Sequence, residues 1–274
     1  PVEELCEQVC VKNTSEEKPV AIGQLQRYAT DYVLENWKQL FKRAPVSGKK
    51  IAIVGGGPAG LSCAHRLAML GHSVTIYESR DEPGGLNEYG LAAYKMLEDR
   101  AAREVTYILD IGGINLETGK SLGEDFALSD LRREFDAVFI GLGQNAVNAL
   151  GMENENVDGV YNAVDFIELI RQEDLSTLPV GRDVVVVGGG NTAIDMAVQI
   201  KKLGAESVTL VYRRGFEEMG ATEYEQHVAQ TNGVLIRIHA QPHRILTEDD
   251  QLCAIEFEYT KKDDTGKLAG TGET

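Results

Sequence analysis

The feature that most constrains the fold is a repeated pattern of strand, glycine-rich turn, helix and strand. It occurs over residues 49–80, KKIAIVGGGPAGLSCAHRLAMLGHSVTIYESR, and again over residues 182–214, RDVVVVGGGNTAIDMAVQIKKLGAESVTLVYRR. A short apolar strand that runs into glycines and then into a helix is the arrangement that binds dinucleotides. Two copies therefore predict an α/β fold with two nucleotide-binding domains.

The first loop places Gly55, Gly57 and Gly60 in a G-x-G-x-x-G spacing. The first glycine permits a tight turn, the second lets the backbone approach a pyrophosphate, and the third lets the helix pack closely. The helix predicted from Ala59 to Leu70, with Pro58 just before it, would offer free N–H groups to the phosphates. A carboxylate, Glu78, ends the second strand, where it can accept hydrogen bonds from a ribose. The alternative is a glycine turn that serves packing alone.

In the second repeat, the second strand ends in basic residues instead of an acid. The candidate binding residues of this repeat are Gly188, Gly189, Gly190, Asn191, Thr192 and Ala193. Arg213 and Arg214 can pair with a 2′-phosphate, which favours NADP(H) over NAD(H). Glu217 and Glu218 follow closely and weaken that interpretation, and a solvated strand end is the alternative.

A second glycine pair distinguishes the two repeats. Gly84 and Gly85 follow Glu78, and we find no such pair after the second repeat. A second close approach of the backbone suits a larger, folded ligand, so the first site is predicted to bind FAD and the second a nicotinamide nucleotide. Hydride transfer between these cofactors requires no acid–base triad of the protein. The absence of a C-x-x-C motif disfavours a dithiol enzyme.

The N-terminal region carries Cys6 and Cys10, a C-x-x-x-C pair that by itself fits a zinc site, a disulfide or no site. The apolar spacing after it predicts a helix over 20–41. One face of that helix would contain Ile22, Gln26, Ala29, Val33, Trp37 and Leu40. On this face Gln26 is the only polar member. It is either a hydrogen-bonded core amide or a residue that binds something else.

Composition narrows the function classes. The net charge is −16, from 27 basic and 43 acidic residues, which disfavours nucleic acid and anionic membranes as partners. No apolar run approaches the ~20 residues of a membrane span. Four scattered cysteines indicate a reducing compartment, and we expect the cytoplasm. Because the chain opens at Pro1 without Met and ends in a polar stretch, we expect a piece of a longer protein.

Further strands are predicted at 136–140, 234–238 and 253–259, and the acidic segment 148–177 is expected to be partly helical. The run Val184–Val187 suits a strand that is buried on both faces.

Six stretches carry a family resemblance: PVEELCEQVC, PVAIGQLQRYAT, VGGGPAGLSCAHRLAMLGH, PGGLNEYG, DAVFIGLG and VVGGGNTAIDMA. Together they resemble the flavin subunit of dihydropyrimidine dehydrogenase of the bacterial NAD-dependent type, with the glutamate synthase small subunit as a wider relative. The resemblance implies part of an α-helical iron–sulfur domain (1–48), then the first half of an FAD domain (49–147), whose C-terminal completion is absent from this sequence. An NAD(P) domain (148–274) follows. Both nucleotide domains would be Rossmann-like.

The resemblance also implies site residues. The family's FAD fingerprint maps onto Gly55, Gly57, Gly60, Glu78, Gly84, Gly85 and Leu86, with Lys95 as a flavin contact and Leu142 and Gly143 beside the cofactor. Its NAD(P) site maps onto Gly189, Gly190, Asn191, Thr192, Arg213 and Arg214. A third basic residue of NADP-specific relatives would fall near Gly220, which favours NAD.

For the iron–sulfur part, the resemblance implies two [4Fe-4S] clusters. Cys6 and Gln26 would serve one cluster and Cys10 the other. The first cysteine of the family's motif would precede Pro1. The clusters therefore require upstream chain.

The implied function is electron input. Hydride would pass from NAD(P)H to FAD, and electrons would continue through the clusters to an FMN-type partner that reduces uracil or thymine, in a hetero-oligomer. One alternative is a glutamate synthase small subunit. An alternative of another class is an NAD(P)-binding scaffold or redox sensor without turnover.

Overall fold

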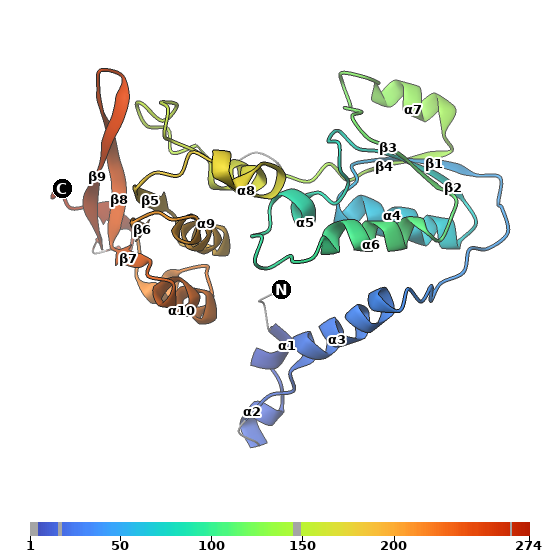
Figure 1. Cartoon of the computed structure of the whole chain (residues 1–274), viewed down its shortest axis with the longest axis horizontal. Coiled ribbons are helices and arrows are strands. Elements are labelled where there is room, and N and C mark those ends of the chain that lie inside the picture. Colours follow the sequence, from blue (N-terminus) through green and yellow to red (C-terminus); the bar gives the residue numbers. More distant parts are fainter. Residues whose placement is uncertain (1–4, 16–17, 145–148, 264) are drawn as a thin grey trace. The chain divides into compact units, whose positions relative to one another are not determined.

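The computed structural model describes residues 5–15, 18–144, 149–263 and 265–274 (Figure 1). The chain divides into two compact units. The first comprises the described residues within Pro1–Tyr89 and Lys95–Asn145, and the second those within Gly90–Tyr94 and Ala146–Thr274. The predicted domain boundaries, after residues 48 and 147, stay a prediction, because the compact units do not show which segments bind which cofactor.

The first unit begins with three helices and continues as an α/β layer structure. Its elements are α1 (Leu5–Gln8), α2 (Lys12–Ser15), α3 (Ile22–Glu35), β1 (Lys50–Val54), α4 (Pro58–Met69), β2 (Ser73–Tyr77), α5 (Leu86–Tyr89), α6 (Arg100–Leu109), β3 (Ile114–Glu117), α7 (Leu128–Glu134) and β4 (Ala137–Ile140).

The four strands of this unit form a parallel sheet in the order β3-β2-β1-β4. Successive residues of β1 point to opposite faces of the sheet. Ile53 packs with Leu61 of α4 and Val105 of α6, whereas Val54 packs with Leu131 of α7. Helices α4 and α6 therefore cover one face and α7 the other (Figure 1).

The N-terminal helix differs from the prediction. Helix α3 ends at Glu35, and Trp37 has a positive φ of 46°, which a helix does not allow. Gln26 and Ala29 are exposed, and the buried residue of α3 is Leu34. The predicted apolar face is therefore wrong, because the helix instead turns Arg27, Asp31 and Leu34 inward; the side chain of Arg100 donates to Asp31.

The second unit has the same plan with an added antiparallel sheet. Its elements are α8 (Ala163–Gln172), η1 (Leu175–Thr177), β5 (Asp183–Val187), α9 (Asn191–Lys202), β6 (Ser207–Tyr212), η2 (Phe216–Glu218), α10 (Glu223–Thr231), β7 (Leu235–Ile238), β8 (Ala240–Glu248), β9 (Gln251–Lys262) and β10 (Leu268–Gly270).

Strands β5, β6 and β7 are parallel in the order β5-β6-β7, and β8, β9 and β10 are antiparallel. The core includes Ile167 of α8, Ile194 of α9 and Leu210 of β6, all 0% exposed. The prediction that Val184–Val187 is buried on both faces is wrong for Val185, which is 41% exposed. Among the described strands β5 pairs with β6 alone, so it lies at the edge of its sheet.

Five residues from the middle of the first unit's sequence belong to the second unit. Within Gly90–Tyr94, the backbone N–H of Ala93 donates to Gln199 Oε1 (2.9 Å), and Tyr94 Oη donates to Asp195 Oδ1 (2.6 Å). Burial and the nearby Asp195 carboxylate raise the pKa of Tyr94, so its hydroxyl stays protonated as the donor. This anchored segment, Gly90–Tyr94, is called the strap below.

The main sequence predictions about the fold are confirmed. Both strand–loop–helix–strand repeats form, and the predicted strands at 136–140, 234–238 and 253–259 correspond to β4, β7 and β9. A partly helical 148–177 corresponds to α8 and η1. The α/β class is therefore correct, and an α-helical segment precedes the first repeat.

Candidate nucleotide-binding sites

In the first unit, the predicted residues gather at the carboxyl ends of the parallel strands. The loop Gly55–Gly57 follows β1, Glu78 follows β2, and Gly141–Gly143 follows β4. The N–H of Gly55 donates to Tyr77 O (2.8 Å), and the N–H of Gly141 donates to Val54 O (2.8 Å). This edge of an open parallel sheet is where such folds bind ligands.

The glycines of this loop are required by close contacts. A Cβ on Gly60 would lie 1.9 Å from Gly55 O, and one on Gly55, whose φ is +106°, would lie 2.3 Å from Gly141 O. Side chains at either position would therefore collide with backbone. Helix α4 begins at Pro58, which leaves its first N–H groups at the loop.

Glu78 is buried under the loop. Its carboxylate Oε2 accepts from the Gly56 N–H (2.6 Å), and Oε1 accepts from the Arg80 N–H (2.9 Å). Only 7% of Glu78 is exposed. Ser79 Oγ also donates to Oε1 (3.3 Å); since each carboxylate oxygen has two lone pairs, Oε2 keeps acceptor capacity for a ribose hydroxyl. Glu78 thus also holds the loop in shape, a role that the sequence did not indicate.

The second glycine pair packs directly against the first loop. The Gly84 N–H donates to Gly56 O (2.9 Å), and a Cβ on Gly85 would lie 2.8 Å from Gly57 Cα. Both glycines have positive φ, of 129° and 55°. Tyr89, the last residue of α5, fixes this segment, because its hydroxyl donates to Glu82 O and accepts from the Glu82 N–H, both at 3.0 Å.

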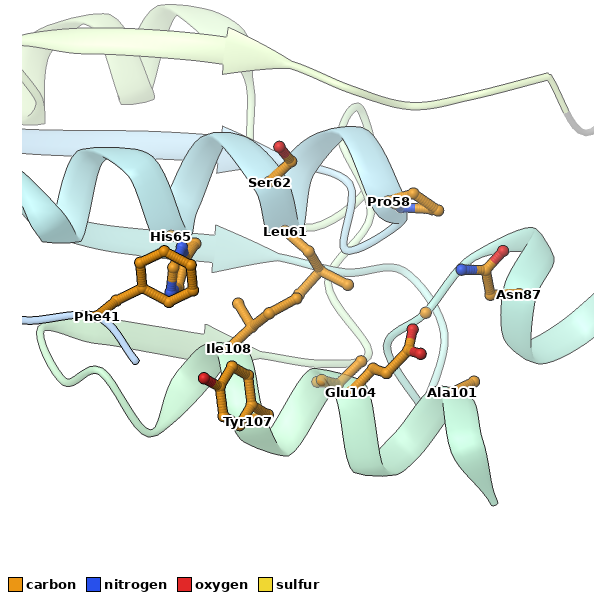
Figure 2. Close-up of a pocket in the computed structure, with 12 residues that line it drawn as sticks. Phe41, Pro58, Leu61, Ser62, His65, Asn87, Ala101, Glu104, Tyr107 and Ile108 are labelled. Carbon is orange, nitrogen blue, oxygen red and sulfur yellow. The ribbon is translucent and has the colours of Figure 1, made fainter. Parts of the chain in front are cut away.

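A cavity of about 340 Å³ lies between α4 and α6 (Figure 2). Two predicted FAD residues, Pro58 and Gly84, line it. Phe41 from the linker before β1 lies beside His65, with ring centroids 5.0 Å apart. Burial lowers the pKa of His65, and its Nε2 has no hydrogen-bond partner among the described residues.

The remaining predicted FAD residues differ in exposure. Leu86 and Leu142 are 50% and 53% exposed, and Gly143 has a φ of +71°. Lys95 is half-buried in the turn directly after the strap. The Leu142 N–H lies near the place where a Gly55 Cβ would stand (3.3 Å). These assignments stay predictions, and the structure places Leu142 beside the loop.

The second loop repeats the first. The Gly188 N–H donates to Val211 O (3.0 Å), and α9 begins at Asn191 with Thr192 and Ala193 in its first turn. A Cβ on Gly190 would meet nothing within 4 Å, so this glycine faces open space. The buried Oδ1 of Asn191 has no hydrogen-bond partner among the described residues. The loop therefore presents open backbone and an unused acceptor.

Tyr212 occupies the position that Glu78 has in the first unit. Tyr77 pairs with Val54 and Val211 pairs with Val187, so Glu78 and Tyr212 are each the next residue. The ring of Tyr212 covers Gly189, where a Cβ would lie 2.4 Å from it, and its hydroxyl donates to Glu218 O (2.7 Å). Tyr212 is not among the residues that the sequence predicts to bind a nucleotide.

Arg213 and Arg214 follow Tyr212 and are exposed and half-buried, respectively. Their backbone is held from the antiparallel sheet: Thr260 Oγ1 donates to Arg213 O (2.6 Å) and the His239 N–H donates to Arg214 O (3.3 Å). Within the described ranges, neither guanidinium has an ion pair with a carboxylate. Two cations therefore stand at the end of β6, available to an anion.

The predicted cluster ligands lie at the N-terminus of the first unit. Cys6 is exposed on α1, Cys10 is half-buried in the turn after it, and Gln26 is exposed on α3. Glu7 Oε1 accepts from the Gly23 N–H (3.2 Å), which ties α1 to α3. In the part of the chain that the structure describes, no group of three or more His, Cys, Asp or Glu residues is arranged to hold a metal. These residues alone therefore do not complete a cluster.

None of the helices described is long and apolar enough to cross a membrane.

Comparison with known proteins identifies the families. Residues 49–271 match the pyridine nucleotide-disulphide oxidoreductase family, and residues 1–38 match dihydropyrimidine dehydrogenase domain II, 4Fe-4S cluster. FprA of Mycobacterium tuberculosis in complex with NADPH has a TM-score of 0.66 and 20% identity, over 84% of this chain and 68% of FprA. At this identity the likeness shows the fold.

Two curated relatives have higher identity. The NAD-dependent dihydropyrimidine dehydrogenase subunit PreT of Salmonella typhimurium is 34% identical over 236 residues, 86% of this chain and 56% of PreT. The glutamate synthase [NADPH] small chain of Escherichia coli is 35% identical over 253 residues, 88% of this chain and 53% of that protein. The chain thus spans about half the length of each.

The predicted resemblance is confirmed, because both named relatives and both family matches agree with it. The cofactor types predicted from the two loops, FAD and a nicotinamide nucleotide, are those of this fold, and the N-terminal match is to a 4Fe-4S domain. From its match over 49–271, this chain belongs to the pyridine nucleotide-disulphide oxidoreductase family, with an N-terminal segment of the dihydropyrimidine dehydrogenase 4Fe-4S type.

Proposed function

We propose that this chain is the electron-input part of an NAD(P)H-dependent flavin and iron–sulfur oxidoreductase. The observation that carries the proposal is one loop geometry built twice with different chemistry beside it. The first loop has a buried carboxylate, Glu78, that could bind a ribose. The second has two adjacent arginines, Arg213 and Arg214, which make no ion pair among the described residues and could bind a phosphate.

FAD would bind at the first loop. Gly55, Gly57 and the start of α4 at Pro58, Ala59 and Gly60 would receive the pyrophosphate, and Gly84, Gly85 and Leu86 would border it. The fit rests on contacts in this chain, since the loop is closed by glycines that tolerate no Cβ. When bound, FAD supplies the chemistry of accepting a hydride. Lys95 and Leu142 would lie beside the flavin.

The nicotinamide nucleotide would bind at the second loop. Gly188, Gly189 and Gly190, with Asn191, Thr192 and Ala193, would hold its pyrophosphate at the N-terminus of α9. Arg213 and Arg214 would contact the adenosine ribose or its 2′-phosphate. The protein's part is to hold the two cofactors and to exclude side reactions, and the cofactors carry the redox chemistry.

The partner of this module is proposed from the N-terminal segment. Its match to dihydropyrimidine dehydrogenase domain II supports [4Fe-4S] clusters with Cys6, Cys10 and Gln26 among the ligands, once upstream chain supplies the others. PreT is named as a subunit, which supports a hetero-oligomer with a catalytic subunit that reduces pyrimidines at FMN. The identities of 34% and 35% do not separate this partner from that of glutamate synthase. We place the assembly in the cytoplasm.

The test is spectroscopic and uses the full-length protein that contains this chain, because the resemblance implies that the FAD domain is completed outside it. The purified protein is incubated with FAD, freed of excess FAD by gel filtration, and titrated anaerobically with NADPH and, separately, with NADH. We expect a retained flavin absorption band that bleaches on addition of a reduced nucleotide. A protein that retains nucleotide but no flavin would instead support the scaffold or sensor alternative.

The pyrimidine partner is tested separately. The full-length protein that contains this chain is mixed with a candidate pyrimidine-reducing subunit, and uracil-dependent oxidation of NAD(P)H is followed. Uracil-independent oxidation, or transfer only to a glutamate synthase large chain, would contradict the pyrimidine proposal.

A further inference from the structure

A lysine far along the sequence pairs with an acid that follows the arginine pair of the second unit. Lys262, the last residue of β9, places its Nζ 3.1 Å from Glu218 Oε1. In the sequence, Glu218 and its neighbour Glu217 are the two acidic residues that weaken the prediction of a 2′-phosphate site. The two acids therefore have different surroundings, which the sequence does not reveal.

The direction of Lys262 follows from strand alternation. Residues two apart on a strand point to the same face, and residues one apart to opposite faces. Thr260 points to the β6 end, because its hydroxyl donates to Arg213 O (2.6 Å). Lys262 lies on that same face, and Lys261 lies on the other.

The Glu218 carboxylate is paired with Lys262, and among the described residues it has no ion pair with Arg213 or Arg214. The Lys262 ammonium, which donates to it, is the main reason that the pKa of Glu218 lies below its ordinary value, with smaller contributions from the Gly215 N–H and the charge of Arg214. The Tyr212 hydroxyl donates to Glu218 O and closes the loop 212–218. Glu218 is thus fixed by groups other than the two guanidiniums.

The charge balance depends on Lys262. Arg213, Arg214 and Lys262 outnumber Glu217 and Glu218 by one, and removal of Lys262 cancels the surplus. A freed Glu218 carboxylate would also compete for Arg214 with any incoming phosphate, because both are anions that a guanidinium binds by charged hydrogen bonds. NAD(H) has a hydroxyl at this place and would be affected little.

We propose that Lys262 is a positioning residue for nucleotide specificity: it holds Glu218 away from the arginine pair and so makes this chain prefer NADP(H) to NAD(H). The inference rests on the proposed function, namely that the second loop binds a nicotinamide nucleotide. Lys262 adds a third positive charge from β9 to a site where Gly220 offers none. Lys262 acts through Glu218 and is not itself a ligand of the phosphate.

The test measures equilibrium binding of NADP⁺ and NAD⁺ by isothermal titration calorimetry, which requires no turnover. The wild-type chain is expected to bind NADP⁺ more tightly. Lys262→Gln is expected to weaken NADP⁺ binding about three- to fivefold, the upper part of the range of an exposed ion pair, and to leave NAD⁺ within about twofold. The matched control Lys261→Gln removes the same charge from the opposite face and is expected to change neither affinity.

A double variant separates positioning from direct contact. If Lys262 acts by holding Glu218, then Lys262→Gln combined with Glu218→Gln is expected to restore NADP⁺ affinity to the wild-type level. A double variant as weak as Lys262→Gln alone overturns the inference, and so does equal weakening of both nucleotides. Thermal unfolding of each variant confirms that the second unit is folded.

The inference and the proposed function fail in different ways. Wild-type chain that binds NAD⁺ as tightly as NADP⁺, or more tightly, overturns the role of Lys262 and leaves the nucleotide site intact. Wild-type chain that binds neither nucleotide overturns the proposed function itself, and the inference with it.

Discussion

The two glycine loops have nearly the same backbone and opposite chemistry. In each, the residue at the carboxyl end of the second strand covers the middle glycine: Glu78, just after β2, lies over Gly56, and Tyr212, the last residue of β6, lies over Gly189. Glu78 turns a carboxylate inward to accept the loop's N–H, whereas Tyr212 covers the loop with a ring and sends its hydroxyl to Glu218. One register position therefore decides whether the loop is closed by a charge or by an aromatic face.

The second unit has no glycine pair after its second strand, as the sequence indicates, but a segment of other residues lies in the equivalent place. In the structure, the Gly84 N–H donates to Gly56 O and the Ala221 N–H donates to Gly189 O, both at 2.9 Å. By these bonds Ala221 corresponds to Gly84 and Thr222 to Gly85, so the segment Ala221–Thr222 follows the second loop as the glycine pair follows the first. The two segments differ in the side chains of Ala221 and Thr222 and in the positive φ of both glycines in the first unit.

The largest effect is expected at the third position of each loop. Gly60→Ala would place a Cβ 1.9 Å from Gly55 O and should cost about 3 kcal/mol or prevent folding of the first unit. Ala193→Gly should cost about 1–2 kcal/mol, since it loosens a helical residue and removes one buried methyl group. Urea unfolding followed by the fluorescence of Trp37, the single tryptophan, reports the first unit, and circular dichroism reports both. Equal costs at the two positions would show that the loops are packed alike.

A smaller effect is expected where the two covering residues differ. Glu78→Gln retains the shape but offers one oxygen to two N–H donors, so the first unit should lose about 2 kcal/mol and bind FAD less tightly. Tyr212→Phe loses one bond at a partly exposed site and should cost about 0.5–1 kcal/mol. Urea midpoints and FAD titrations measure these changes. As a control, Glu82→Gln alters an exposed side chain of the same segment and should be neutral. A loss of stability in Glu82→Gln as large as that in Glu78→Gln would show that the buried carboxylate of Glu78 has no particular role in holding the loop.

The strap offers a weaker perturbation that should affect the second unit alone. Tyr94→Phe removes the donor to Asp195 Oδ1 and should cost about 1 kcal/mol. Tyr224→Phe, at a tyrosine that is 64% exposed, is the matched control and should be silent. Thermal unfolding by circular dichroism measures the loss. If Tyr94→Phe instead lowers the Trp37-detected midpoint, the strap stabilises the first unit.

The smallest effect is a dependence on acid that belongs to the first unit. Burial tends to raise the pKa of Asp31, but Arg27 and Arg100 outweigh it and hold the pKa below its ordinary value of 3.8. A lowered pKa stabilises the fold above the unfolded value, and this contribution is lost as the pH falls through the folded one. The difference in urea midpoint between wild type and Asp31→Asn should be constant at neutral pH and shrink below about pH 4. A difference that grows on acidification would contradict the assignment.

Local pattern predicted the repeated units well because each strand, glycine turn and helix is specified within about 30 consecutive residues. It failed for α3, where the apolar spacing continued to Leu40 but the helix ended at Glu35. Spacing alone could not show that an ion pair with Arg100, distant in sequence, selects a different inward face. It failed also for Val185, because the number of neighbouring strands is a property of the sheet and not of the strand.

The sequence by itself determined the fold class, both nucleotide loops and the basic end of the second repeat, because these depend on residues close together in the chain. Only the tertiary structure decided how these residues are used. It turned Glu78 under its own loop, anchored the strap on α9, and brought Lys262 to Glu218 across 44 positions of sequence. Charges and hydrogen bonds act over a few ångströms whatever the separation along the chain, so such pairings arise only when the chain is folded.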